Sequence, residues 1–391
     1  MNIVFYRYGS IYEPDMIMAF EKAGLNVIEI TPEIKNKDIT AVDRMKEVES
    51  CIVRYSPLFV YGINFYPIIA EICRIYKVMY ISQTVDSPIM TLFSNSILHD
   101  TNRIFLFDRE QYNYFHPYNK DCIFHLPLAS ATERFDKIIS TIDSNDRKKF
   151  RSDISFVGST YKEKDPLASL SSLDDYTKGY IEALVNSCIK IFGYYPVKDS
   201  LNDRIVSDIR TSAGNDFPVI DKKICDMDSY AVSHEYIGSH IAVVERRKTL
   251  NALAKHFNVD LYTQSDTSDL EGVIVHGSVR TLDEMPKVFN LSKINLNITM
   301  RSIESGLPLR CFDILGCGGF LMTNYQPELE DMFVIGRDLE AYSSIDELID
   351  KCSYYLSHED ERAAIARSGY EKVCSAHTHF HRMKEMLSKV M

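Results

Sequence analysis

Apolar residues recur along the chain in two patterns, short β-rich runs and longer runs with helical spacing. The first 30 residues show both, because NIVFYRY is β-rich, EPDMIMAFEKAGL has helical spacing and ends at Gly24, and NVIEI is β-branched. The alternation continues through the strand-like runs PLFVYGIN, KVMYISQTVD, RIFLFD and CIFHLPLA. Strands that alternate with helices pair in parallel, so the pattern predicts a doubly wound α/β domain over residues 1–150.

A second alternating series follows the polar segment DKIISTIDSNDRKKFRS, which we expect to separate two domains. It begins with strand-like DISFVGSTY and continues through helix-like IAVVERRKTLNALAKHF and strand-like VDLYT, VIVHG, INLNIT and FLMTN. This predicts a second doubly wound domain over residues 151–375, interrupted at about 165–238 by a helical insertion. The last helix, 376–391, is a candidate for crossing back to the first domain. Ligands of such folds bind at the carboxyl ends of the strands, so we expect them in a cleft between the domains.

Composition narrows the class of protein. A chain of 391 residues is long for one core, which agrees with two domains. The formal charge of -11 argues against a general nucleic-acid binder. The nine cysteines include no C-x-x-C pair, the N-terminus lacks the layout of a signal peptide, and no run of 18 apolar residues occurs. We therefore expect a cytoplasmic protein with reduced thiols and no membrane span.

The stretch GLPLRCFDILGCGGF, residues 306–320, carries the strongest chemical signal. It follows strand-like KINLNIT, and its helix is expected to start at about Pro308, which suits the first turn. Gly306 permits a tight turn, and the free N–H groups of the helix start favour phosphate or carboxylate. Arg310 adds a bidentate cation, and Asp313 lies on the same face one turn later, where it could accept from vicinal hydroxyls. The other interpretation is an ordinary i,i+3 ion pair.

A family resemblance adds to this interpretation. The run SKINLNITMRSIESGLPLRCFDILGCGGFLMTNYQPELEDMF, with HTHFHRM near the C-terminus, resembles the C-terminal domain of CgeB-type glycosyltransferases. The N-terminal half resembles the uncharacterised domain that often precedes it, through QTVDSPIM, RIFLFDREQY, HLPLA and DISFVGSTY. The resemblance implies a bacterial enzyme with a GT-B fold: two Rossmann-like doubly wound domains facing a cleft, the second carrying the helical insertion. It also implies a nucleotide-activated sugar as the donor.

The resemblance assigns roles to several positions. In related GT-B enzymes the loop and helix corresponding to 306–310 hold the diphosphate, the acidic position of Asp313 binds ribose hydroxyls, and the loop GSVR meets the base, largely through its backbone. Glycogen-synthase-type relatives have a glutamate eight positions before the later acidic residue, whereas this chain has Ser305 there, with Glu304 beside it. The donor-binding residues implied in these segments are Gly277, Val279, Arg280, Ser305, Gly306, Leu307, Pro308, Leu309, Arg310 and Asp313.

Two further segments could complete the donor site. FVGST ends a strand with Gly158, Ser159 and Thr160, which suit hydrogen bonding to a diphosphate, although a plain turn is the alternative. Arg246, in the run ERRK, matches an arginine of the family and could neutralise the leaving nucleotide. Arg247 and Lys248 are expected to lie on a solvated helix face.

Two carboxylates are candidates for a catalytic base in the first domain. Asp86, in TVDSP, stands at a strand end, where it could orient or deprotonate an acceptor hydroxyl. Asp15 lies in the loop after the first strand, the other position where GT-B enzymes sometimes keep a base. Either residue could instead cap a helix, and PDMIMAF makes this alternative strongest for Asp15.

The resulting hypothesis is a glycosyltransferase that takes a sugar from a nucleoside-diphosphate sugar, most plausibly a UDP-sugar. The helix N–H groups, Arg310, Arg246 and Ser159 would stabilise the leaving diphosphate, so we expect neither a metal nor another cofactor. The acceptor stays open among a protein, a glycan and a small molecule, with the insertion as the expected place for its recognition. The alternatives are a non-catalytic nucleotide-sugar-binding relic of the fold and a sugar-nucleotide epimerase.

Overall fold

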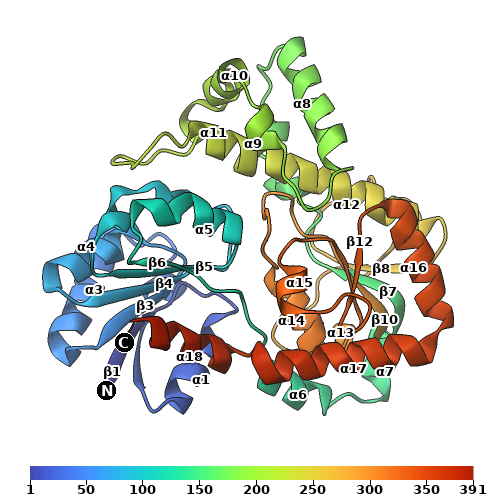
Figure 1. Ribbon diagram of the computed structural model, residues 1–391, viewed down its shortest axis with the longest axis horizontal. Helices are drawn as coiled ribbons and strands as arrows, with labels where there is room; N and C mark the ends of the chain where they lie inside the picture. The colour runs from blue at the N-terminus through green and yellow to red at the C-terminus, as the bar shows by residue number, and fades with distance from the viewer. Residues whose placement is uncertain (391) are drawn as a thin grey trace. The chain divides into compact units, whose positions relative to one another are not determined.

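The computed structural model describes residues 1–390 and consists of two units, each built on its own parallel sheet (Figure 1). Unit 1 contains residues 1–129, the short segment 219–226 and the segment that begins at Thr378. Unit 2 contains residues 130–218 and 227–377. Both sheets have six strands, all in parallel, as the alternation of strand-like and helix-like runs predicts.

The sheet of unit 1 has the strand order β2-β1-β3-β4-β5-β6. The order reverses between β1 and β3, so the carboxyl ends of these two strands mark the switch point where ligands of doubly wound sheets bind. Every residue of the central β3 is buried, as expected for a strand covered on both faces. The strands are β1 (Asn2–Tyr6), β2 (Asn26–Ile30), β3 (Phe59–Ile63), β4 (Met79–Gln83), β5 (Asn102–Leu106) and β6 (Ile123–His125).

The helices of unit 1 cover the two faces of its sheet (Figure 1). α18 (His379–Val390) packs against α1 (Glu13–Lys22), so the last helix completes a layer of the first unit. Its Arg382 donates from Nε to the carbonyls of Pro127 (2.8 Å) and Leu128 (3.1 Å). The other α-helices are α2 (Pro32–Lys35), α3 (Ala41–Tyr55), α4 (Pro67–Tyr76) and α5 (Arg109–Phe115).

The segment 219–226 belongs to unit 1 although it lies within the sequence of the insertion. Lys223 forms an antiparallel bridge with Ser94, and the N–H of Asn95 donates to the carbonyl of Lys222 at 2.7 Å. The N–H of Ile224 also donates to the carbonyl of Phe93 at 2.9 Å. These backbone bonds add the segment to unit 1 without extending its sheet.

The sheet of unit 2 has the order β12-β11-β10-β7-β8-β9, so the strand order reverses between β7 and β10. Its inner strands contribute Ile154, Phe156, Leu261, Ile294 and Leu296 to one buried apolar cluster. The strands are β7 (Ser152–Val157), β8 (Val259–Tyr262), β9 (Ile274–Val275), β10 (Ser292–Asn297), β11 (Leu321–Asn324) and β12 (Glu340–Tyr342). β12 was not predicted, because three residues without a β-branched run give no strand signal.

Two helices occupy the segment that the sequence suggested as a polar separator. They are α6 (Thr132–Ile139) and α7 (Ser144–Phe150), and both pack against α13 (Met285–Leu291) of unit 2. α7 begins with a capping box formed by Asp143 and Asp146. The unit boundary therefore lies at 129/130, ahead of the expected position at residue 150, because α6 buries Phe135 and α7 buries Phe150.

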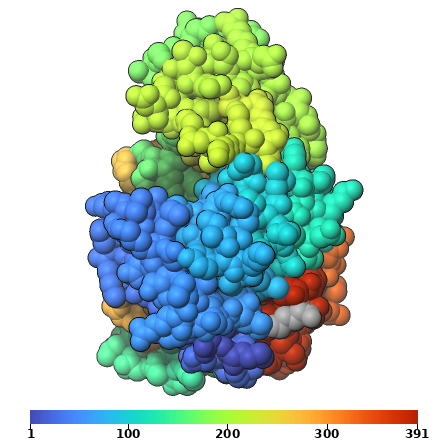
Figure 2. All heavy atoms as spheres, turned by 90° about the vertical axis from the view of Figure 1, so that its left-hand side faces the viewer, coloured from blue at the N-terminus to red at the C-terminus, as the bar shows by residue number. Residues whose placement is uncertain are grey.

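The insertion is helical, as its sequence predicts. It contains α8 (Asp175–Cys188), α9 (Val197–Ser200), α10 (Asp203–Ala213) and α11 (Asp228–Tyr230). A π-helix at Ala231–Ile237 then joins α11 directly to α12 (Gly238–Ala254). In the space-filling view the insertion is the part coloured light green to yellow (Figure 2).

The helices that complete unit 2 are α14 (Leu309–Gly316), α15 (Leu329–Met332), α16 (Ile345–Ser357) and α17 (Glu359–Ala376). α14 packs on α17, and Gly369 allows this close approach, since a Cβ there would lie 2.7 Å from Cδ2 of Leu315 in α14. Within residues 1–390, no helix combines the length and the apolar character needed to cross a membrane.

Candidate functional site

Arg246 joins the two strand ends at the switch point of unit 2. It projects from α12 and is buried, with 9% of its surface exposed. Nη1 donates to the carbonyl of Ser159, which follows β7, and Nη2 donates to that of Ile298, which follows β10, at 2.8 Å. The ring of Tyr161 lies 4.4 Å from the guanidinium carbon. Among residues 1–390, no carboxylate lies within ion-pair distance of Arg246, and its Nε is buried without a hydrogen-bond partner.

The loop after β7 is ordered by hydroxyl groups. Ser159 donates from Oγ to Glu163 at 2.7 Å and accepts from the N–H of Tyr161 at 2.7 Å. The N–H of Thr160 donates to the hydroxyl of Ser265 at 2.9 Å. Burial acts to raise the pKa of Glu163, but the hydrogen bonds from Ser159 and Ser265 outweigh it and lower that pKa. Tyr161 has a φ of 68°, a backbone conformation uncommon for a bulky residue and frequent at functional sites.

The segment singled out in the sequence forms the start of α14. The helix starts at Leu309, one position after the expected start at Pro308, which is the N-cap, and Leu309 and Arg310 occupy the first turn. The N–H groups of a first turn have no acceptor within the helix, so they remain able to bind an anion. Because α14 connects the carboxyl end of β10 with the start of β11, its N-terminus faces the ligand-binding edge of the sheet.

Arg310 rests on an apolar surface and contacts one carboxylate loosely. Its guanidinium carbon lies 5.2 Å from the ring centre of Phe289, and Nη1 contacts the sulfur of Met285. Nη1 also lies 3.6 Å from Oδ2 of Asp313, whose side chain is 8% exposed. The ion pair that the i,i+3 spacing allows is therefore present, but its length exceeds that of a hydrogen bond.

The two arginines interact electrostatically. Burial lowers the pKa of Arg246, and the positive charge of Arg310 lowers it further. Burial also lowers the pKa of Arg310, against the opposing effect of Asp313. Desolvated like charges are costly, and an anionic ligand between them would reduce that cost. The carboxyl edge of this sheet thus holds two guanidinium groups with little compensating negative charge.

Residues 298–308, which we call the donor loop, connect β10 with α14. The side chain of Asn324 accepts from the N–H of Thr299 at 2.8 Å, and Gln326 donates to the carbonyls of Ile303 (2.7 Å) and Gly306 (3.2 Å). The hydroxyl of Ser305 donates to Glu328 at 2.7 Å. Ser305 and Leu307 are buried. Side chains at the end of β11 and just beyond it therefore fix the shape of this loop.

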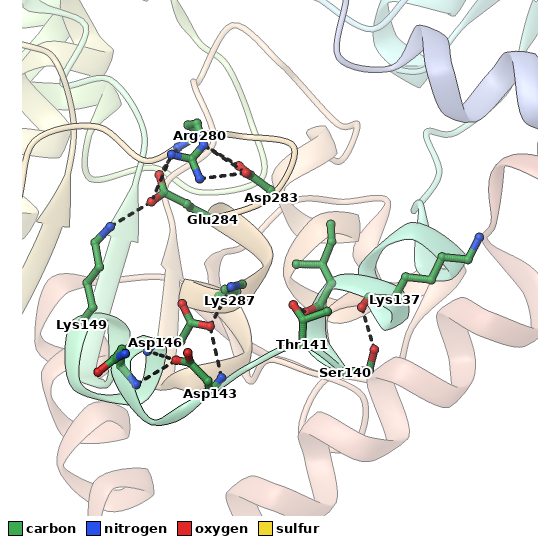
Figure 3. Close-up of polar contacts among 12 residues, drawn as sticks. Lys137, Ser140, Thr141, Asp143, Asp146, Lys149, Arg280, Asp283, Glu284 and Lys287 are labelled. Carbon is green, nitrogen blue, oxygen red and sulfur yellow. Dashed lines mark hydrogen bonds and ion pairs between the residues drawn. The ribbon is translucent and has the colours of Figure 1, made fainter.

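The predicted base-binding loop, GSVR, lies in an exposed part of unit 2. Gly277 has a φ of 72°, which justifies a glycine there, and Val279 is half-buried. The side chain of Arg280 forms ion pairs with two nearby carboxylates, those of Asp283 (2.8 Å) and Glu284 (3.7 Å) (Figure 3). This pairing, mainly with Asp283, raises the pKa of Arg280. Since the Arg280 side chain is engaged in ion pairs, the backbone of the loop offers the groups for a ligand.

Figure 3 also shows that the side chain of Glu284 connects this loop to α7. Glu284 accepts from Lys149 at 2.9 Å, and Lys287 of α13 pairs with Asp146 at 2.7 Å. These residues line a hollow of about 380 Å³ together with Lys137, Thr141 and Arg280. Lys149, Arg280 and Lys287 each have an acidic partner here, in contrast to Arg246.

Asp86 lies at the switch point of unit 1. It is exposed and accepts from the side-chain amide of Asn64 at 2.8 Å. Asn64 follows β3, has a φ of 60°, donates to the hydroxyl of Tyr8 at 3.3 Å and accepts from the N–H of Val85 at 3.0 Å. Burial, followed by the charge of Asp86, raises the pKa of Tyr8 to about 12. The residues after β1, β3 and β4 thus form one polar cluster.

Asp15 has a different environment. It lies in the first turn of α1 and is buried, with 3% of its surface exposed. The N-cap of this helix is Tyr12, so the alternative of Asp15 as the cap residue is wrong. Glu13 instead binds the preceding loop, accepting from the N–H groups of Tyr8 (2.9 Å) and Gly9 (3.1 Å).

Sequence reasoning missed a second layer of residues around the donor loop. Arg301 forms a buried bidentate ion pair with Glu245 of α12, at 2.6 and 3.0 Å. Glu304 pairs with His234 and Lys198 of the insertion. The run ERRK drew attention to its cations, but nothing in the sequence indicates that its glutamate has a buried partner. Among residues 1–390, no three His, Cys, Asp or Glu side chains are grouped so that they could hold a metal ion.

Comparison with known proteins agrees with the two-domain architecture. Residues 246–388 match a family model described as glycosyl transferase-like, and no curated protein matches the chain. Sucrose-phosphate synthase from Thermosynechococcus elongatus is structurally similar, with a TM-score of 0.56 at 10% identity over 100% of this chain and 99% of that one. Anabaena HepE, solved with UDP and glucose, has a TM-score of 0.53 at 9% identity over 100% of both chains. The chain has the GT-B glycosyltransferase fold.

Proposed function

We propose that this protein is a glycosyltransferase that uses a nucleoside-diphosphate sugar, in the first instance a UDP-sugar. The observation that carries the proposal is the pair of guanidinium groups, Arg246 and Arg310, at the carboxyl edge of the sheet of unit 2. Arg246 has no acidic partner within residues 1–390, and Arg310 has one at 3.6 Å. A diphosphate would supply the missing negative charge.

Other donor contacts follow from the neighbouring elements. The first-turn N–H groups of α14, at Leu309 and Arg310, and the positive end of the helix dipole would bind phosphate oxygens. Asp313 would exchange its loose contact with Arg310 for the ribose hydroxyls. Ser159 and Thr160 would contact the diphosphate from the loop after β7, and the backbone of 277–280 would meet the base. A structurally similar protein was solved with UDP-glucose, which supports this donor class.

In the proposed reaction the bond between the anomeric carbon and the diphosphate oxygen breaks, and its electron pair goes to the diphosphate. The acceptor hydroxyl oxygen forms the new bond to the anomeric carbon and gives up its proton. Arg246, Arg310 and the N–H groups of α14 would stabilise the charge that grows on the leaving diphosphate, without a metal ion. We assign the proton acceptor to Asp86, since it is exposed whereas Asp15 is buried.

The test measures binding and turnover with UDP-sugars. Wild-type protein is titrated with UDP and then incubated with UDP-glucose and UDP-N-acetylglucosamine, with and without EDTA, while free UDP and converted sugar are measured. We expect EDTA-resistant UDP release, and Arg310→Ala is expected to reduce it at least about 100-fold because it removes a donor aimed at the developing charge. Asp313→Asn should mainly weaken UDP binding. Arg367→Ala, which alters an exposed arginine of α17, is the control.

The alternatives give different results in this assay. Nucleotide binding without UDP release, across protein, glycan and small-molecule acceptors, would indicate a non-catalytic relic of the fold. Conversion of the sugar while the nucleotide stays attached would indicate an epimerase. UDP release that Arg310→Ala and Arg367→Ala reduce equally would contradict the assigned donor site.

A further inference from the structure

We infer that the helical insertion is part of the donor site, because it holds the donor loop in shape through Glu304. This inference rests on the proposed function for its meaning, since the loop matters only if it binds a nucleotide. Its structural content can nevertheless be tested without a ligand. Glu304 acts here as a positioning residue, rather than as the sugar contact made by the first glutamate of glycogen-synthase-type relatives.

The first observation is that two residues of the insertion bind both oxygens of one carboxylate. Oε1 of Glu304 lies 3.0 Å from Nε2 of His234, and Oε2 lies 2.7 Å from Nζ of Lys198. The side chain of Glu304 is 12% exposed. Burial acts to raise the pKa of Glu304, but His234 and Lys198 outweigh it and lower that pKa. The carboxylate is therefore held in its charged form by groups from outside the loop.

The second observation is that His234 is itself fixed in place. It is 1% exposed, and its ring stacks on Tyr230 at 3.9 Å between centroids with 10° between the planes. Its Nδ1 lies 2.6 Å from the hydroxyl of Ser233 and 3.2 Å from the carbonyl of Tyr230. It also lies in the π-helix at Ala231–Ile237, a conformation that is rare in proteins and frequent at functional sites. The imidazole thus presents Nε2 to Glu304 with little freedom to turn away.

The third observation is that the donor loop contacts one continuous helical segment, residues 231–254, at successive positions. We call this segment the rod. The π-helix and α12 run without a break over residues 231–254. Going down the rod, His234 contacts Glu304, Gly238 meets Ser302, Glu245 pairs with Arg301 and Arg246 donates to Ile298. The partners therefore descend in number from 304 to 298 as the rod ascends from 234 to 246. The rod and the donor loop lie antiparallel, and the same rod delivers Arg246 to the switch point.

Gly238 offers a sharp test of this register. It has a φ of -61° and a ψ of -42°, so an alanine there meets no backbone strain. A Cβ at this position would lie 2.9 Å from Cβ of Ser302, which is too close, and 3.3 Å from the carbonyl oxygen of Ser233. Alanine also has a higher helix propensity than glycine. Gly238→Ala should therefore leave the rod intact and displace the loop.

The experiment combines hydrogen exchange with UDP titration on the full chain. We expect amides of residues 299–306 to exchange roughly tenfold faster in Glu304→Ala and Gly238→Ala than in wild type, because one loop contact of about 1.4 kcal/mol is lost. Glu182→Ala, an exposed change on α8 of the same insertion, is the matched control. Exchange at wild-type rates in both loop variants would overturn the inference, whether or not the protein binds a nucleotide.

A second readout separates positioning from general destabilisation. His234→Ala is expected to weaken UDP binding about tenfold, whereas His234→Gln, which keeps an N–H donor near Nε2, should stay within about threefold of wild type. The double variant His234→Ala/Glu304→Ala should match Glu304→Ala alone, since Glu304→Ala already removes the contact with His234. Equal losses in His234→Ala and His234→Gln, or additive losses in the double variant, would contradict the inference. A wild-type protein that binds no nucleoside diphosphate would contradict the proposed function, while the exchange experiment would still decide the inference.

Discussion

The two sheets present opposite chemistry at corresponding places. In each sheet the strand order reverses next to the first strand, and polar side chains gather at that carboxyl edge. In unit 2 the edge holds Arg246 and Arg310, two guanidinium groups in apolar surroundings. In unit 1 it holds Tyr8, Asn64 and Asp86, which combine a phenol, an amide and an exposed carboxylate. One topology thus carries two different sets of side chains, which agree with the two roles proposed above: anion binding in unit 2 and proton acceptance in unit 1.

The largest effect expected from this difference between the units is a loss of turnover in the variant Asp86→Asn. Removing a general base typically slows a reaction by about 100-fold or more, so UDP release that depends on an acceptor should fall by at least that factor. UDP affinity should stay at the wild-type value because unit 2 carries the nucleotide contacts. Steady-state kinetics and calorimetric titration measure the two quantities. A matched change of an exposed carboxylate of unit 1, Asp121→Asn, should alter neither, and a parallel fall in affinity with Asp86→Asn would break the comparison.

A smaller effect is expected for Arg246→Met, which keeps much of the apolar stem and removes the charge. UDP affinity should fall by roughly tenfold to a hundredfold, since charge-assisted hydrogen bonds contribute about 1.5–3 kcal/mol. The melting temperature should change little, because losing an unpaired buried charge offsets the two carbonyls left without a donor. Lys248→Met, on the exposed side of the same helix, is the control. An unchanged UDP affinity in Arg246→Met would contradict the proposal that unit 2 binds the anion through this residue.

The smallest effects concern pH, and they should have opposite signs in the two units. The pKa of Glu304 is lowered in the folded protein, so its contribution to stability is complete above the ordinary value of about 4.3 and is lost as the pH falls below it. The pKa of Tyr8 is raised to about 12, so its contribution is complete below its ordinary value of 10.0 and is lost as the pH rises through about 12.

Equilibrium unfolding in urea measures this difference. Relative to wild type, Glu304→Gln should cost stability at pH 7 and progressively less below pH 4, according to the titration of that carboxyl. Tyr8→Phe should cost stability at pH 9 and progressively less as the pH approaches 12. A destabilisation that is constant with pH in both variants would show that neither group titrates as its surroundings require.

The sequence predicted the parallel sheets well because buried parallel strands are nearly continuous apolar runs. The sequence did not predict the elements that depend on packing against distant parts of the chain. The sequence of α6 is mostly polar, and the helix is stabilised by burial of Phe135, which the sequence alone does not show. β12 is too short to be predicted without its neighbour β11. The expectation for Asp86 at a strand end used a signal that Asn64 also carries, since Asn64 directly follows a buried run. Asn64 was not predicted, because a neutral amide gives no signal for a catalytic base.

The candidate site shows the same division between local and distant information. Glycine and proline before Arg310 indicate a loop followed by a helix start, so the place of Arg310 could be predicted from adjacent residues. The place of His234 could not, because its partner Glu304 is 70 residues further along the chain. Tyr161 has a positive φ, and its ring contacts Arg246, which lies 85 positions further along the chain, so no local pattern indicates this contact.

Unit 1 is not a continuous stretch of chain, and this affects the order in which the protein can be made. The chain passes from one unit to the other at 129/130, 218/219, 226/227 and 377/378. α18, which packs on α1, follows unit 2 along the chain, so unit 1 is completed only after unit 2 has been synthesised in full. Until then the side of α1 that α18 covers lacks this partner, and a fragment ending at residue 129 would lack it permanently.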